Sequence, residues 1–177
     1  MRYFSIPSIS KSLLAFNSLQ KLLDIGNSLP ACQWSIRPYK FTDSDWSIIT
    51  PILDQIPLKP HSIALLVTTK FSKSSIHCDH IPNPPSYNGL AQSTGRITAI
   101  NIDLQDDSDG CFEYIGDNNQ ILDKLQFSHA KCLRVDLPHR SNNSLSSKNR
   151  IILSFSYLDS IDRLHDEFQN FNIVTKV

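Results

Sequence analysis

The spacing of hydrophobic positions changes near residue 62. Before it, apolar residues recur at intervals of three and four, which is the period of an amphipathic helix. This spacing predicts a first helix that starts after an N-cap at Ser8 or Ser10 and runs to about Ile25, where Gly26 is placed to end it. Its apolar stripe consists of Ile9, Leu13, Phe16, Leu19, Leu22 and Leu23.

A second amphipathic helix is predicted from Thr42 or Asp43 onward. Its apolar positions are Trp46, Ile49, Ile52 and Leu53. Pro51 falls inside this segment and disturbs its middle, because proline has no backbone N–H and crowds the preceding turn. We expect both helices to cover one face of a sheet.

After residue 62 the pattern becomes that of short strands, with alternating or continuous β-branched and aliphatic residues separated by turn-rich pieces. The predicted strands are 63–69, 96–104, 110–115, 131–137 and 150–158. Residues 159–170 form a candidate closing helix. A run of strands without intervening helices favours a sandwich or barrel. We therefore expect a single domain over residues 1–177, with helical support in 1–60, a β core in 61–158 and a C-terminal helical segment in 159–177.

Composition narrows the class of protein. The chain has 177 residues, with 17 Lys and Arg against 17 Asp and Glu, and this neutral balance disfavours a nucleic-acid target. No apolar run is long enough to predict a membrane-spanning helix. The four cysteines are widely and irregularly spaced, which indicates reduced thiols in a cytoplasmic protein. Residues 1–23 carry three basic residues and no acid before Asp24, so an organellar transit peptide is the alternative to an amphipathic first helix.

The segment His77-Cys78-Asp79 carries the most informative chemistry. Residues two apart on a strand share a face, so His77 and Asp79 are expected to point the same way and Cys78 the other way. One imidazole and one carboxylate are two-thirds of the facial triad that holds non-haem Fe(II). Taken alone, the same pair also fits a polar pair beside a loop. His80 adjoins it as a substitute ligand if the register differs.

His139 and Arg150 supply what the pair lacks. His139 follows the predicted strand 131–137 and lies 60 residues after Asp79, which makes it the candidate third ligand. Arg150 opens the last predicted strand, which we expect to pair antiparallel with 131–137 across the loop 141–149. That pairing would place Arg150 deep in a barrel near the metal, where its planar guanidinium suits a carboxylate ligand.

This combination resembles the Fe(II)/2-oxoglutarate-dependent oxygenase superfamily over about residues 77–157. The family pattern of HxD, a distal histidine and a following arginine reads here as His77, Asp79, His139 and Arg150. The piece Gly95-Arg96-Ile97-Thr98 is similar to prolyl-hydroxylase-like members. The resemblance implies a mainly β protein with flanking helices, built on a double-stranded β-helix of the jelly-roll, cupin-like type.

The resemblance also implies site roles. His77, Asp79 and His139 would bind Fe(II), and Arg150 would hold the C5 carboxylate of 2-oxoglutarate. Many members carry a serine two residues after the arginine, where this chain has Ile152, and Ser154 on the same face is the expected substitute. Asn101 is expected to point into the barrel beside the iron or to satisfy a strand neighbour.

The implied activity is a hydroxylase that uses Fe(II), 2-oxoglutarate and O₂ on a small molecule or on an amino-acid or peptide side chain, releasing succinate and CO₂. Two alternatives remain open: a cupin-type metal protein that does not use 2-oxoglutarate, and an inactive barrel that serves as an interaction module. Arg96 is expected to make either a strand-end ion pair or a contact to a carboxylate ligand. Residues 81–93 are either a lid over the metal or an ordinary connection.

Overall fold

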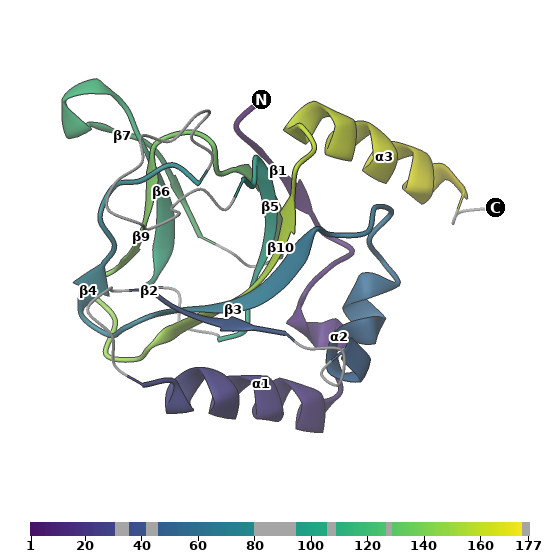
Figure 1. The fold of residues 1–177 in the computed structure, drawn as a ribbon, viewed down its shortest axis with the longest axis horizontal. Helices are drawn as coiled ribbons and strands as arrows, with labels where there is room; N and C mark the ends of the chain where they lie inside the picture. The colour runs from purple at the N-terminus through teal and green to yellow at the C-terminus, as the bar shows by residue number, and fades with distance from the viewer. Residues whose placement is uncertain (31–35, 42–45, 80–94, 106–108, 127–128, 175–177) are drawn as a thin grey trace.

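Two antiparallel β-sheets face each other, and helices cover the outer face of the larger sheet (Figure 1). The computed structural model describes residues 1–30, 36–41, 46–79, 95–105, 109–126 and 129–174. The six-stranded sheet has the order β1 (Tyr3–Ile6), β8 (Ala130–Arg134), β5 (Thr98–Asp103), β10 (Arg150–Tyr157), β3 (Ser62–Thr68) and β2 (Ile36–Lys40). The four-stranded sheet has the order β4 (Ser72–Lys73), β9 (His139–Asn143), β6 (Cys111–Ile115) and β7 (Ile121–Leu125).

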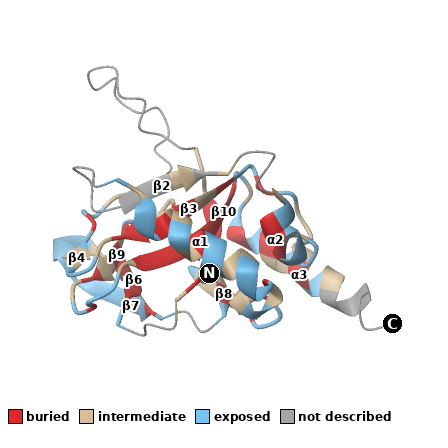
Figure 2. Cartoon of the chain, turned by 90° about the horizontal axis from the view of Figure 1, so that it is seen from below, coloured by how far each residue is buried: buried red, intermediate tan, exposed pale blue. Residues whose placement is uncertain are grey.

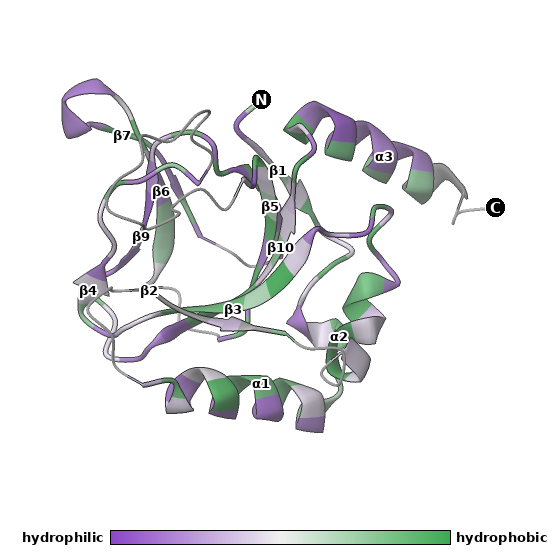
Figure 3. Ribbon diagram, in the orientation of Figure 1, coloured by the Kyte–Doolittle hydropathy of each residue, from purple (hydrophilic) through white to green (hydrophobic). Residues whose placement is uncertain are grey.

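Three α-helices and two short 3₁₀ turns complete the described chain. They are η1 (Lys11–Leu13), α1 (Phe16–Ser28), α2 (Trp46–Leu53), η3 (Asp117–Asn119) and α3 (Ile161–Val174). The helices are amphipathic, with apolar residues turned toward the larger sheet (Figure 3). Burial of these apolar faces, rather than helix propensity, is what holds such short helices in place.

The central strand β10 is buried along its whole length, as Figure 2 shows in red. Because successive side chains of a strand point to opposite faces, the strand contributes to two separate interiors. Ile151, Leu153, Phe155 and Tyr157 join the large apolar core between the sheet and the helices. The alternate residues, which begin with Arg150, face the four-stranded sheet. The second, smaller apolar core lies on that side and includes Phe112, Tyr114 and Leu133.

The predicted strands after residue 62 are present with small changes of boundary, and the closing helix is present as α3. The strand prediction failed for β1, β2, β4, β7 and β9. These strands are two to five residues long and lie at or near sheet edges, where a period of two is hard to recognise. Two of them belong to residues 1–60, so that part supplies strands as well as helices.

The first predicted helix is wrong at both ends. Ser10 caps a separate turn, η1, by accepting a hydrogen bond from the Ser12 N–H at 3.3 Å, and the chain then becomes extended at Leu14 before α1 begins. Gly26 does not end α1, which continues to Ser28. The glycine is needed instead for close packing, since a Cβ there would lie 2.8 Å from Ile151 Cδ1.

The expected pairing of the last two core strands is also wrong. His139 does not end β8 but begins a further strand, β9, and that strand lies in the four-stranded sheet beside β6. The last strand, β10, pairs with β3 and β5 in the other sheet. The segment between β9 and β10 therefore crosses from one sheet to the other and is not a hairpin loop.

Within the described residues, no helix is long and apolar enough to cross a membrane. Cysteines 78, 111 and 132 are free thiols there, as expected. The cytoplasmic location and the transit-peptide alternative remain predictions from the sequence.

We predict that Gly26→Ala destabilises the protein although alanine favours helices. The new methyl group meets three atoms of the Ile151 side chain, and such overpacking costs roughly 1–3 kcal/mol against a helix-propensity gain of about 1 kcal/mol. Urea unfolding checks the free energy of unfolding. The double variant Gly26→Ala/Ile151→Val should recover most of the loss, and a single variant more stable than wild type would contradict this packing account.

Candidate metal centre

His77, Asp79 and His139 come together at one point, although 60 residues separate the last two. One candidate ligand atom from each lies within 4.8 Å of the others. The Nε2 atom of His77 is 3.7 Å from Asp79 Oδ1, and the Nε2 atom of His139 is 3.8 Å from Asp79 Oδ2. The three side chains predicted as one ligand set are therefore neighbours in the folded chain.

Backbone pairing holds the two histidines in place. His77 and His139 form an isolated antiparallel bridge in which each N–H donates to the other residue's carbonyl oxygen at 3.0 Å. Residues opposite each other in such a pair point to the same face, and the two ring centroids are 4.4 Å apart. The Asp79 N–H donates to the Val135 carbonyl at 2.7 Å, which fixes the carboxylate beside them.

Each histidine is oriented by a carbonyl two residues before it. The Nδ1 atom of His77 lies 2.8 Å from the Ser75 oxygen, and the Nδ1 atom of His139 lies 2.8 Å from the Leu137 oxygen. A carbonyl oxygen only accepts, so a neutral ring carries its proton on Nδ1 and presents the Nε2 lone pair. The Nε2 lone pairs of both rings are thus available beside the Asp79 carboxylate. A backbone carbonyl on the other ring nitrogen is common for histidines that bind a metal.

His139 is held in the neutral form that a metal requires. Its side chain is only 3% exposed, and burial lowers its pKa to about 4, with the nearby Asp79 charge opposing that change. The Phe112 ring stacks on the imidazole with centroids 4.8 Å apart, which excludes water from that side. Burial also raises the pKa of the thiol of Cys78, which lies between the other two candidate ligands, so this thiol favours its protonated form.

Arg96 forms an ion pair with the candidate carboxylate ligand. Its NH2 nitrogen lies 2.5 Å from Asp79 Oδ2, and its NH1 donates to the Ser156 hydroxyl at 3.3 Å. Of the two roles expected for Arg96, the structure therefore shows the ion pair. A guanidinium at Oδ2 orients the carboxylate and leaves Oδ1, on the His77 side, as the oxygen better placed for a metal.

Arg150 is buried on the inner face, but its neighbours differ from the expectation. Its Nε donates to Asp103 Oδ2 at 2.9 Å, and its NH1 donates to the Cys111 carbonyl at 2.9 Å and the Ser141 hydroxyl at 3.3 Å. Ser141 lies two residues after His139 on the same face of β9. The arginine is therefore connected to the metal side through β9, and it already has a carboxylate partner.

Asn101 and Ser154 are opposite each other on β5 and β10, with side chains that face the space between the sheets. The residues are 4% and 0% exposed, and within the described part of the chain neither the Asn101 Oδ1 atom nor the Ser154 hydroxyl has a hydrogen-bond partner. A buried polar atom without a partner costs about 1–3 kcal/mol. Such atoms indicate a place where a ligand or water completes the hydrogen bonding.

Sequence reasoning missed Asp103 and Gly110. Asp103 is two residues after Asn101 on an alternating strand, so the period of two contained the signal that it shares the inner face. Gly110 lies against Arg150, since a Cβ there would be 2.5 Å from Arg150 Cδ. His80 and the candidate lid 81–93 lie outside the described residues.

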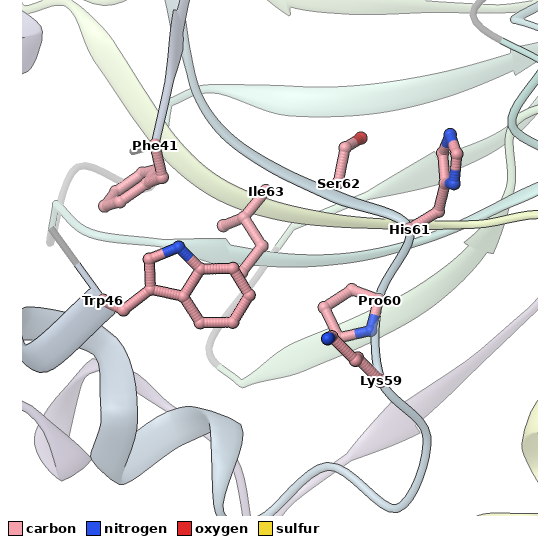
Figure 4. A pocket seen from close by; sticks show the side chains of 7 residues that line it. All are labelled: Phe41, Trp46, Lys59, Pro60, His61, Ser62 and Ile63. Atoms are coloured by element: carbon pink, nitrogen blue, oxygen red, sulfur yellow. The ribbon is translucent and has the colours of Figure 1, made fainter. Parts of the chain in front are cut away.

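A separate hollow of about 360 Å³ lies at the start of β3 and contains none of the three candidate ligands (Figure 4). It is lined by Phe41, Trp46, Lys59, Pro60, His61, Ser62 and Ile63. Its lining is mostly apolar and holds no paired histidine and carboxylate.

No protein-family model matches the sequence, and no curated protein does either. Several solved structures resemble the fold. A viral collagen prolyl hydroxylase from Paramecium bursaria Chlorella virus-1, in complex with 2-oxoglutarate, has a TM-score of 0.56 at 11% identity over 88% of this chain and 95% of that chain. HygX from Streptomyces hygroscopicus, with nickel, 2-oxoglutarate and hygromycin B bound, has a TM-score of 0.51 at 12% identity over 87% and 81%.

A prolyl-4-hydroxylase from Pseudomonas putida gives a TM-score of 0.53 at 8% identity over 89% of this chain and 93% of that chain. At these identities the likeness establishes the fold alone. The prediction of a mainly β, double-stranded β-helix with flanking helices is confirmed.

We predict that the metal-free protein loses stability as the pH falls below about 6.5. The folded state disfavours protonation of His139, so the unfolded chain binds the proton first. The pKa difference between about 6.5 unfolded and about 4 folded lowers the free energy of unfolding by up to roughly 3 kcal/mol between pH 7.5 and pH 4. An NMR titration of the His139 ring checks the pKa directly. A His139 ring that titrates near 6.5 would contradict the burial argument.

Proposed function

We propose that this chain is a non-haem Fe(II)- and 2-oxoglutarate-dependent oxygenase that hydroxylates a small molecule or an amino-acid side chain. The observation that carries the proposal is the cluster of His77, Asp79 and His139, whose candidate ligand atoms lie within 4.8 Å of one another, with each Nδ1 beside a carbonyl oxygen. The fold supports it, because the solved structures of similar fold include a prolyl hydroxylase and HygX, each with 2-oxoglutarate bound.

The donor set fits Fe(II). Two neutral imidazoles and one carboxylate form the facial triad of non-haem iron, and three protein ligands leave positions open for a cosubstrate and O₂. When bound, Fe(II) with 2-oxoglutarate supplies the oxidation of a substrate C–H bond by O₂, with release of succinate and CO₂. The protein's own part is to orient both histidines, to keep His139 neutral, and to hold Asp79 through Arg96.

Arg150, Ser154 and Asn101 are the residues that we assign to the cosubstrate. Arg150 would bind the distal carboxylate, because it is a buried cation on the inner face whose NH1 reaches β9 two residues beyond His139. Ser154 and Asn101 offer buried polar atoms that lack hydrogen bonds in the described structure. The Ser154 hydroxyl would donate to a cosubstrate oxygen. The Asn101 Oδ1 atom only accepts, so Asn101 would contact the cosubstrate through its NH2 group.

The support for the substrate class is less specific than the support for the metal site. The structures of similar fold include a collagen prolyl hydroxylase and HygX with hygromycin B bound, so this fold accommodates both an amino-acid residue and a small molecule. The neutral balance of charges in this chain agrees with such substrates better than with a polyanion.

A second candidate function is a cupin-type metal protein that does not use 2-oxoglutarate. The specific observation in its favour is the Arg150–Asp103 ion pair, because the arginine assigned to the cosubstrate already has a carboxylate partner. The two candidates differ in ligand binding at Arg150 and agree on the metal.

We predict that the protein binds one Fe(II) under anaerobic conditions, and that His77→Ala, Asp79→Ala and His139→Ala each weaken binding by at least 100-fold. Each substitution removes one of the three candidate ligands found among the described residues. Anaerobic Fe(II) titration measures the affinity, and Co(II) spectra report the coordination. The exposed His129→Ala variant is the matched control and should bind as wild type does. If the triad variants retain wild-type affinity, the metal lies elsewhere.

We further predict that the iron-loaded protein converts 2-oxoglutarate to succinate slowly without substrate, and faster with the right member of a metabolite and peptide library. The double variant Arg150→Gln/Asp103→Asn should bind 2-oxoglutarate at least 10-fold more weakly than Asp103→Asn alone, because it lacks the guanidinium, and should keep Fe(II) binding. It replaces the buried ion pair by a neutral hydrogen-bonded pair, so the fold does not retain an unpaired buried charge. Complete absence of turnover and of 2-oxoglutarate binding in wild type would favour the cupin-type function.

A further inference from the structure

We propose that Asp103 determines which ligands Arg150 accepts: its carboxylate neutralises the guanidinium, so the site binds a 2-oxo acid with an anionic distal end less tightly than the arginine alone would allow. This inference rests on the proposed function, because it concerns the cosubstrate end of the same site. Asp103 acts as a specificity-determining residue.

The carboxylate of Asp103 is firmly placed. Its side chain is 5% exposed, and that of Arg150 is 2% exposed, so water screens the pair poorly. Oδ2 accepts from Arg150 Nε at 2.9 Å, and Oδ1 accepts from the Gln105 N–H at 3.2 Å. Both carboxylate oxygens thus have partners, and β5 and β10 are directly paired at this level.

The arginine has little room to leave Asp103. Its NH1 donates to the Cys111 carbonyl and to the Ser141 hydroxyl, on the strands β6 and β9 of the facing sheet. Gly110 lies so close to the arginine stem that even a Cβ would be 2.5 Å from Arg150 Cδ. A ligand carboxylate that reaches this guanidinium therefore meets it with Asp103 in place on the Nε side.

Two carboxylates around one buried guanidinium carry a net negative charge. Like charges that share a buried site destabilise each other, and this repulsion lowers the affinity for the incoming anion. Burial already raises the pKa of the Asp103 carboxyl, with the Arg150 charge opposing that rise, so the interior tolerates this negative charge poorly even before a second anion arrives. A ligand with an uncharged distal end avoids the repulsion.

The geometry therefore predicts an unusual selectivity. Wild type should discriminate little between 2-oxoglutarate and 2-oxopentanoate, which has the same carbon chain without the distal carboxylate. Removing the Asp103 charge should restore a preference for the dianion. Asn at position 103 keeps the size of the side chain and an oxygen that can accept from Arg150, so the arginine stays oriented while its charge becomes available.

The test uses the full chain loaded with Ni(II), so that no turnover occurs, and isothermal calorimetry with each 2-oxo acid. Asp103→Asn should bind 2-oxoglutarate at least 10-fold more tightly than wild type and should change 2-oxopentanoate affinity by less than about threefold. Asp103→Ser serves if the Asn variant folds poorly. Asp123→Asn is the matched control, since it removes the same charge from a more exposed pair with Arg2 and should change neither affinity.

The outcomes separate the two proposals. If wild type binds 2-oxoglutarate and Asp103→Asn binds it equally or more weakly, the selectivity role is overturned while the oxygenase proposal stands. If Ni(II) binds but neither wild type nor the Asp103 variants bind 2-oxoglutarate, the cosubstrate assignment is overturned together with this inference. Binding by the variants alone would support the inference in its strongest form.

Discussion

The structure depends on one strand that is buried on both faces. The side chains of β10 alternate between a large apolar core under the helices and a space between the sheets. The apolar half supplies the burial energy that offsets the conformational entropy lost on folding. This burial energy allows the opposite face of β10 to place Arg150, Ser154 and Ser156 in the interior. Buried polar groups destabilise the folded state unless they are paired or bind a ligand.

The buried charges on the inner face occur in opposite pairs. Asp79 pairs with Arg96 at the metal end, and Asp103 pairs with Arg150 near the other end of β10. Each pair lowers the cost of burying its members, which is large for an isolated ion. The same pairing affects function, because a carboxylate expected to bind metal and an arginine expected to bind a cosubstrate each have a protein partner. A metal at Asp79 or a carboxylate ligand at Arg150 would therefore either replace an existing ion pair or bind in addition to it.

The two histidines show how the fold orients a pair of candidate metal ligands. Each Nδ1 faces a backbone carbonyl from its own segment, so the tautomer is set locally. The bridge between His77 and His139 then brings the two rings together from distant parts of the chain. The local carbonyl determines that Nε2 is the ring nitrogen with the free lone pair. The long-range backbone bridge determines where in the fold the two rings lie.

The sequence by itself determined five strands after residue 62, which are β3, β5, β6, β8 and β10, and the four residues of the family pattern. These depend on a period of two and on residue chemistry. It did not determine that β9 and β10 belong to different sheets, since a short polar segment such as 139–149 fits a loop as well as a strand that crosses over. Nor did the sequence show that Asp103 forms an ion pair with Arg150, or that Arg96 forms one with Asp79. Those partners lie 47 and 17 residues apart, and only the tertiary structure decides which buried charges meet, because the energy that pairs them arises after the sheets have closed around them.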